Sequence, residues 1–323
     1  MPAVPLDLDQ LRERLAPFGA EDVTPLAGGA SSLTFSARVD GTLVVVKVAP
    51  PGLPPVLNRD VLRQARVLRA LHGTAVPVPE VVWEDAGNPP DVPPLFVMGF
   101  VEGASLEPLF DLEGSEPEPV VAARMRNAAV TLARLHALDP AEIGLADEPI
   151  VGPAAEIDRW CRLLETIEPA LVPGWEGVAS GLRVTQPTPT VARVVHGDFR
   201  LGNLLATGSE ITTVVDWEIW TVGDPRVDVG WFLTNADPAT YERRTRYADA
   251  LPSVVELVDV YADAIGDDVG DIAWFEALAC FKSTATWSLI VKHNRRRDAP
   301  DPEVEAMAIV LPHLLARARA LTS

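Results

Sequence analysis

An aspartate and an asparagine five residues apart have the types and spacing for chemistry. Asp198 and Asn203 lie in the stretch VVHGDFRLGNLL, residues 194–205, between two apolar pairs typical of buried strand. Unpaired charge near a core is costly, so such residues need a reason to be there. A carboxylate that accepts a hydroxyl proton, followed by an amide oxygen that binds a cation, is the pattern that phosphoryl transfer requires.

A second carboxylate follows at the end of a Val-rich segment. In ITTVVDWE, residues 211–218, we expect a short strand that ends at Asp216. Glu218, two residues on, would then share its face. Mg²⁺ prefers hard oxygen ligands of this kind and leaves coordination positions for phosphate oxygens.

Two features near the N-terminus could contact phosphates. Lys47 is a single lysine inside the apolar strand pattern TLVVVKVAP, and GGASS at 28–32 reads as a glycine turn whose amides could fold over an anion. Alone, each is commonplace, since glycine pairs make hairpins and strand lysines reach solvent. Their order along the chain, followed by Asp198, Asn203 and Asp216, favours a kinase-like arrangement.

The surrounding pattern predicts elements that would position these residues. A helix over 6–18 precedes strands at 33–39 and 43–49, which are joined by an Asp40–Gly41 hairpin. An amphipathic helix over 59–73 and strands at 80–85 and 94–103 follow. Beyond Gly103 the pattern is helical, including segments at 121–138 and 155–167 and several helices near the C-terminus. We therefore expect an α+β fold with two lobes, a small antiparallel sheet with one inserted helix over 1–102 and a large helical lobe over 103–323.

Composition narrows the class of protein. The chain has 323 residues, of which 48% are hydrophobic and 23% charged, as in an ordinary globular protein. A net charge of −19 opposes non-specific binding to nucleic acid. There is no apolar run long enough for a membrane span, and the start MPAVPLDLDQ does not resemble a signal peptide. With only two cysteines, Cys161 and Cys280, a reduced cytoplasmic protein is the expectation.

At these motifs the chain resembles the aminoglycoside phosphotransferase and choline kinase-like family, which shares the protein-kinase-like fold. VVHGDFRLGNLL is similar to that family's catalytic loop, VVDWEIWTVGDPRVDVGWFL is similar to its metal-binding segment, and the resemblance spans roughly residues 24–290. It implies ATP and Mg²⁺ as cofactors and a small hydroxyl-bearing molecule as acceptor.

The resemblance also implies roles for individual residues. Asp198 would be the catalytic base, and Asn203 and Asp216 would hold Mg²⁺. Asp224, Asp228 and His196 would brace the loops. The nucleotide would contact a larger set, namely Lys47, Gly28, Gly29, Ser31, Ser32, Gln64 and the backbone near Met98, Phe100 and Val101.

One position departs from the family pattern. Gln64 stands where a glutamate usually pairs with the strand lysine, and an amide cannot neutralise an ammonium group. Asp60, one turn earlier, is a possible substitute partner for Lys47. An alternative function therefore stays open, a pseudokinase-like module that binds nucleotide with little catalysis.

The sequence says less about the acceptor than about the nucleotide and the metal. The C-terminal region, about 235–315, carries aromatic residues (Trp274 and Trp287), a basic run KHNRRRD at 292–298, and several carboxylates. These are Asp237, Glu242, Asp263, Asp267, Asp268, Asp271 and Glu276. The carboxylates would suit an amine-bearing acceptor such as an aminoglycoside or choline, and the basic run an anionic one such as a sugar phosphate or an acyl thioester. The family resemblance also makes a hydroxyacyl-like acceptor plausible. Either set is also typical of a solvated helix face.

Overall fold

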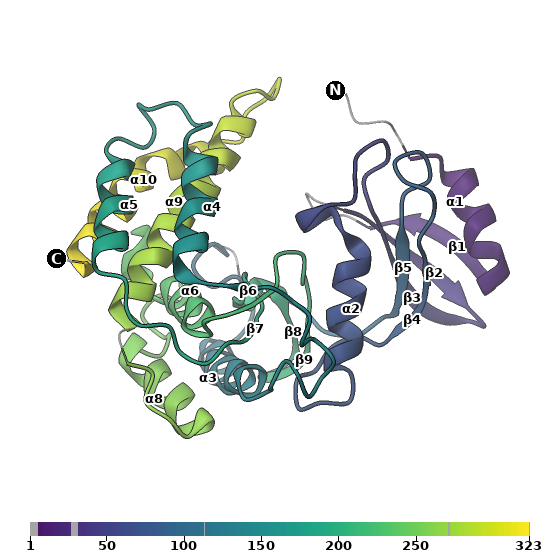
Figure 1. Cartoon of the computed structure of the whole chain (residues 1–323), viewed down its shortest axis with the longest axis horizontal. Coiled ribbons are helices and arrows are strands. Elements are labelled where there is room, and N and C mark those ends of the chain that lie inside the picture. Colours follow the sequence, from purple (N-terminus) through teal and green to yellow (C-terminus); the bar gives the residue numbers. More distant parts are fainter. Residues whose placement is uncertain (1–5, 27–31, 113, 271, 323) are drawn as a thin grey trace.

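The computed structural model describes residues 6–26, 32–112, 114–270 and 272–322, and it has two lobes (Figure 1). The expected α+β, protein-kinase-like architecture is confirmed. The small lobe is a five-stranded antiparallel sheet in the order β1-β2-β3-β5-β4. Its strands are β1 (Ala20–Pro25), β2 (Leu33–Val39), β3 (Thr42–Val48), β4 (Val81–Asp85) and β5 (Leu95–Gly99).

The central hairpin forms as its sequence predicts. Asp40 and Gly41 have φ angles of 48° and 78°, the left-handed pair that a two-residue hairpin turn needs. Alternate residues of β3 then point to opposite faces. Val44, Val46 and Val48 pack toward helix α1 (Leu8–Leu15), and Lys47 points toward the other face of the sheet. The period of two therefore aims the lysine into the space between the lobes.

Helix α2 (Val61–Leu71) covers that second face and also joins the large lobe. Asp60 caps the helix by accepting the amide of Arg63 at 3.0 Å. Val61, Ala65 and Leu68 belong to the same apolar cluster as Trp217 and Trp220 of the large lobe. The helix is therefore buried between the sheet and the large lobe.

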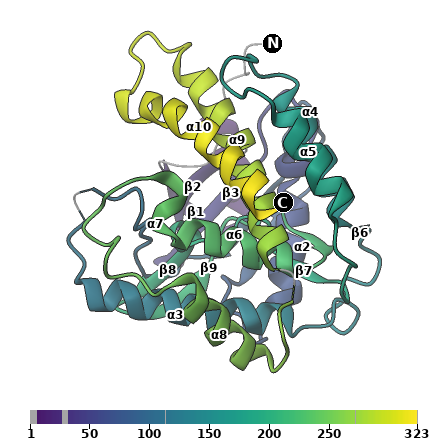
Figure 2. The same cartoon turned by 90° about the vertical axis from the view of Figure 1, so that its left-hand side faces the viewer.

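The large lobe is mainly helical (Figure 2). Its helices are α3 (Glu118–His136), α4 (Pro153–Leu164), α5 (Trp175–Val184), α6 (Arg226–Ala236), α7 (Pro238–Tyr241), α8 (Val254–Ile265), α9 (Ile272–Asn294) and α10 (Pro302–Leu321). Short strands lie between some of these helices in the chain. One sheet consists of β6 (Ile150–Val151), β10 (Thr221–Gly223) and β7 (Arg193–Val195), and a second pairs β8 (Leu204–Thr207) with β9 (Glu210–Val214).

Two expected strands are shorter than the sequence pattern indicated. β5 ends at Gly99 rather than continuing to Gly103, and β9 ends at Val214, before Asp216. The lobe boundary between residues 102 and 103 stays a prediction. In the part of the chain that the structure describes, no helix is both long and apolar enough to cross a bilayer.

Candidate active site

The loop that follows β7 is anchored by hydrogen bonds to the buried carboxylate of Asp228. Asp228, in the first turn of α6, accepts the backbone amides of His196 at 2.6 Å and Gly197 at 2.8 Å. Burial alone would raise the pKa of Asp228, but hydrogen bonds and nearby histidines hold it below its usual value. Gly197 has a φ of +86°, and a Cβ there would lie 2.6 Å from the backbone oxygen of Ile219. Only glycine fits this turn.

His196 links the loop to the neighbouring segment, as its expected bracing role requires. Its Nδ1 accepts the amide of Asp198 at 3.1 Å, and its Nε2 lies 2.9 Å from the oxygen of Val215. Burial lowers the pKa of His196, so the ring is neutral and carries its hydrogen on Nε2. Both ring nitrogens are therefore engaged within the protein, and the imidazole orients the backbone at Asp198.

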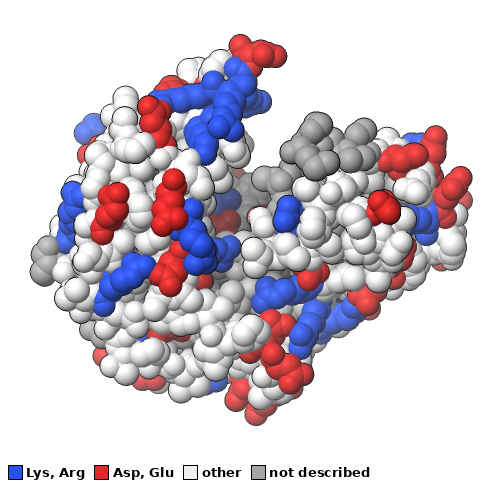
Figure 3. Space-filling view, turned by 45° about the horizontal axis from the view of Figure 1, so that its top comes forward, with Lys and Arg blue, Asp and Glu red and all other residues white. Residues whose placement is uncertain are grey.

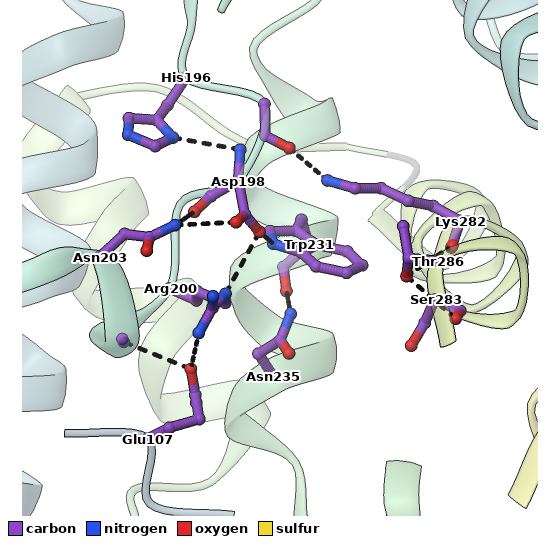
Figure 4. Close-up of polar contacts among 12 residues, drawn as sticks. Glu107, His196, Asp198, Arg200, Asn203, Trp231, Asn235, Lys282, Ser283 and Thr286 are labelled. Atoms are coloured by element: carbon purple, nitrogen blue, oxygen red, sulfur yellow. Dashed lines mark hydrogen bonds and ion pairs between the residues drawn. The ribbon is translucent and has the colours of Figure 1, made fainter. Parts of the chain in front are cut away.

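The Asp198 carboxylate is oriented by three donors (Figure 4). Trp231 Nε1 donates to Oδ1 at 2.8 Å, Arg200 Nε lies 3.3 Å from the same oxygen, and Asn203 Nδ2 donates to Oδ2 at 2.8 Å. Arg200 is fixed in turn by Glu107, whose Oε2 lies 2.6 Å from its Nη1. Burial raises the pKa of Glu107, and the charge of Arg200 offsets only part of that rise.

Asp216 lies beside this loop but not on a strand. Its backbone φ is 67°, and this left-handed turn leads the chain away from β9. The expectation that Asp216 and Glu218 share a strand face is therefore wrong. The amide of Val215 donates to the oxygen of Asn203 at 3.0 Å, which places the loop and the Asp216 segment side by side.

Asn203 and Asp216 present suitable ligands for a divalent cation. The Asn203 amide gives its hydrogens to the backbone oxygen of Asp198 at 2.9 Å and to its carboxylate at 2.8 Å, which leaves Oδ1 as the free ligand atom. Among the described residues no three His, Cys, Asp or Glu side chains form a metal cluster. Two hard oxygen donors completed by phosphate and water oxygens suit Mg²⁺.

Lys47 reaches the same place from the small lobe. Its Nζ lies 3.4 Å from Asp216 Oδ1 and 3.5 Å from Gln64 Oε1. The carboxylate that faces the lysine is thus Asp216. The suggested substitute, Asp60, is wrong because its side chain is used to cap α2.

The other expected nucleotide contacts are only partly described. Gly28, Gly29 and Ser31 lie outside the described residues. Ser32 is buried, and its Oγ has no hydrogen-bond partner in the described ranges. Met98 lies in β5, and Phe100 and Val101 follow in the segment that leads to the large lobe, where the amide of Phe100 lies 3.4 Å from the oxygen of Leu43.

A cavity of about 1120 Å³ opens beside Asp198. It lies at the hollow between the lobes, with α4 and α9 forming one wall (Figure 3). Its lining is rich in aromatic side chains, namely Phe110, Trp160, Trp220, Trp231, Tyr241 and Trp287. Sequence reasoning anticipated only Trp287 among these, because the others lie on segments far apart in the chain.

The carboxylates expected to bind an acceptor do not line this cavity. Asp237 pairs with Arg317, and Glu276 lies 3.9 Å from the same guanidinium. Glu242, Asp263, Asp267 and Asp268 are likewise absent from the lining, and Asp271 lies outside the described residues.

The basic run at 292–298 and Trp274 also lie outside the cavity lining. In the run 292–298, Lys292 donates to the oxygen of Thr166 and Arg295 pairs with Glu305. Trp274 is buried in the core of the large lobe. None of these residues lines the cavity beside Asp198.

Four site residues had no role assigned from the sequence. Lys282 of α9 donates to the oxygen of Gly197 and lies 3.6 Å from the centre of the Trp231 ring. Glu107, Arg200 and Trp231 complete the group around Asp198. The one available signal was a lone lysine in the apolar run of 272–291.

Comparison with known proteins agrees with this geometry. Residues 22–257 match the model of the phosphotransferase enzyme family. Acyl-CoA dehydrogenase family member 10 of Mus musculus is 27% identical over 280 residues, 82% of this chain and 26% of that protein. Family member 11 of Homo sapiens is 26% identical over 291 residues, 84% of this chain and 37% of that protein. The chain thus spans about a quarter to a third of the length of these relatives.

Solved structures share the fold over nearly the whole chain. A Ralstonia eutropha JMP134 protein assigned to the aminoglycoside phosphotransferases has a TM-score of 0.78, 22% identity and 98% coverage of both chains. A thermostable mutant of aminoglycoside phosphotransferase APH(4)-Ia, solved with ADP and hygromycin B, has a TM-score of 0.62, 18% identity and 97% coverage of both.

Proposed function

Because the chain belongs to the phosphotransferase enzyme family, we propose that it transfers the γ-phosphoryl group of ATP to a hydroxyl group of a small molecule. The observation that carries this proposal is the convergence of Lys47, Asp198 and Asn203 with Asp216. These residues come from both lobes and meet beside a cavity large enough for an acceptor.

Asp198 is the base in this proposal. Its carboxylate accepts the proton of the acceptor hydroxyl as the acceptor oxygen forms a bond to the γ-phosphorus. The bond from that phosphorus to the β,γ-bridging oxygen breaks, and ADP leaves with the electron pair. Trp231 and Asn203 hold the carboxylate in position for the acceptor, and Lys47 binds phosphate oxygens.

Asn203 and Asp216 would hold Mg²⁺, which offsets the charge that develops on the phosphate oxygens when it is bound. Lys47 lies beside Asp216, so the lysine and the cation site face the same part of the nucleotide.

A nucleotide-binding module with little catalysis is the second candidate, and the observation that favours it is Gln64. The contact from Lys47 to this amide is 3.5 Å, a weak hydrogen bond. Against it stands the oriented Asp198, since a pure binder has no need of a base beside the acceptor cavity.

The deciding experiment incubates the protein with Mg-ATP and a panel of aminoglycosides, choline and hydroxyacyl compounds. Phosphorylated products are then identified by mass spectrometry. We expect at least one new phosphate ester, with Asp198→Asn as the inactive control. Thermal stabilisation by Mg-ATP without product from any acceptor would favour the binding module.

A further inference from the structure

We propose that the acceptor is anionic: its hydroxyl lies at Asp198, its apolar body lies along Trp231 and Trp160, and its carboxylate or phosphate binds Arg159 and Arg162 of α4. This inference rests on the proposed function, because it names the acceptor class of the same site. All five residues line the cavity.

A continuous path of side chains leads from the base to α4. Trp231 donates to Asp198 at 2.8 Å, and Lys282 Nζ lies 3.6 Å from the centre of the Trp231 ring. The same ammonium group lies 5.7 Å from the Trp160 ring, and the guanidinium of Arg159 lies 4.9 Å from that ring. An acceptor with its hydroxyl at Asp198 would therefore pass Trp231, Lys282 and Trp160 and end at arginine.

Three carboxylates that line the cavity already interact with basic groups of the protein. Glu107 forms an ion pair with Arg200, and Glu148 forms ion pairs with Arg63 and Arg66 at 2.8 and 2.7 Å. Glu156, on α4, faces the ammonium group of Lys282. A polycationic acceptor would have to compete with these arginines for Glu107 and Glu148, whose side chains are largely buried.

The arginines of α4 are different. Among the described residues, neither Arg159 nor Arg162 forms an ion pair with a carboxylate. The chain as a whole has a net charge of −19, yet the Lys and Arg residues of this cavity equal its Asp and Glu residues in number, five of each. Figure 3 shows Lys and Arg side chains along the large-lobe rim of the hollow. Unmatched guanidinium groups at the end of an aromatic wall are suited to a carboxylate or phosphate.

The test compares acceptors that differ only in the group at the far end. Primary alcohols of increasing chain length are offered with Mg-ATP, each ending in a carboxylate, a phosphate, a second hydroxyl or a trimethylammonium group. We expect kcat/KM for an anionic series to exceed that of the matched diols about tenfold or more, which is the effect of one good charge-assisted contact. The better of the two anionic series identifies the natural anion.

The variant Arg159→Gln/Arg162→Gln should remove this preference by lowering kcat/KM for the anionic series to about that of the matched diols. Arg126→Gln is the matched control. It makes the same type of substitution on α3, where Arg126 pairs with Glu256 away from the cavity. In this variant the preference for an anion should persist.

Calorimetric titration of the same alcohols without nucleotide separates this inference from the proposed function. If no acceptor is phosphorylated, tighter binding of an anionic alcohol, lost in the double variant, still supports the inference. Equal or tighter binding of the trimethylammonium alcohols, or an unchanged preference in the double variant, overturns it even where phosphoryl transfer is observed.

Discussion

The side-chain amide of Asn203 donates both of its hydrogens to Asp198, one to the backbone oxygen at 2.9 Å and one to Oδ2 at 2.8 Å. The proposed base and the proposed metal ligand are thus one hydrogen-bonded unit. Because the amide nitrogen is committed to Asp198, the side-chain oxygen of Asn203 is the atom left available to a cation. The orientation of the metal ligand therefore depends on the base.

The first prediction concerns the base itself. Asp198→Asn keeps the volume of the side chain but removes its ability to accept the hydroxyl proton, so we expect kcat to fall about 10²- to 10⁴-fold. The Kd for Mg-ATP should change little, since Lys47 and Asp216 are intact and the new side-chain amide oxygen can still accept the hydrogen of Asn203. Steady-state kinetics and calorimetry measure both quantities, and near wild-type turnover would remove Asp198 from this role.

The second prediction concerns the cation. Asp216→Ala removes an oxygen ligand and the carboxylate beside Lys47, so ATP binding in the presence of Mg²⁺ should weaken about tenfold or more. Adding EDTA should weaken ATP binding to the wild type but have little further effect on the variant. A variant that retains the full Mg²⁺ effect on the Kd would show that the cation binds elsewhere.

The third prediction concerns Gln64. Gln64→Glu would give Lys47 a charged partner in place of an amide 3.5 Å away, and we expect the Kd for Mg-ATP to fall roughly threefold to tenfold. Gln64→Met, which cannot accept the hydrogen bond in the same way, serves as the control. An unchanged Kd in Gln64→Glu would mean that Asp216 alone is sufficient to position the lysine.

The sequence predicted the positions of some site residues better than those of others. Lys47 was predictable because strand alternation in β3 fixes the face it occupies, and the Asp40–Gly41 turn fixes the register of that strand. The spacing of Asp198 and Asn203 was informative because both lie on one short loop. Asp216 was misplaced because a left-handed residue after a strand leaves no pattern when it is not glycine.

The aromatic lining of the cavity could not be predicted from the sequence, for a different reason. These residues come from the segments before α3 and before β10 and from α4, α6, α7 and α9, so only the packing of these elements brings them together. Helix α9 is buried on most of its surface, so its apolar residues show no single face and Lys282 had no periodic pattern to mark it.

The fourth prediction concerns stability. Asp228→Asn would leave two backbone amides, those of His196 and Gly197, without a carboxylate acceptor in a buried site. We expect the free energy of unfolding to fall by about 2–4 kcal/mol, measured by urea denaturation at neutral pH.

The same variant should show a characteristic pH dependence. The native pKa of Asp228 is below its usual value, so its stabilising effect is present above the unfolded pKa of about 3.9. The effect is lost as the pH falls from there toward the native pKa. The difference between wild type and variant should therefore shrink below about pH 4, and a constant difference would exclude this origin.

The fifth prediction concerns Lys282. Burial lowers the pKa of its ammonium group from 10.5 to about 8, although Asp198, Asp228 and Glu156 favour the charged form and Arg159 opposes it. Between these values the unfolded chain binds more protons than the folded one, so stability rises with pH. Relative to Lys282→Met, the wild type should gain about 3 kcal/mol from pH 7 to beyond pH 10, and parallel pH profiles would contradict the buried charge.

Arg63 and Arg66 attach α2 to Glu148, and the Trp220 indole donates to the backbone oxygen of Arg63. These contacts tie α2 to the large lobe, whereas Lys47 belongs to the sheet of the small lobe. A change in the angle between that sheet and the large lobe would therefore alter the distances from the lysine ammonium to Gln64 and Asp216. Closure onto a nucleotide would then be sensed first at Lys47, while Gln64 and Asp216 keep their places.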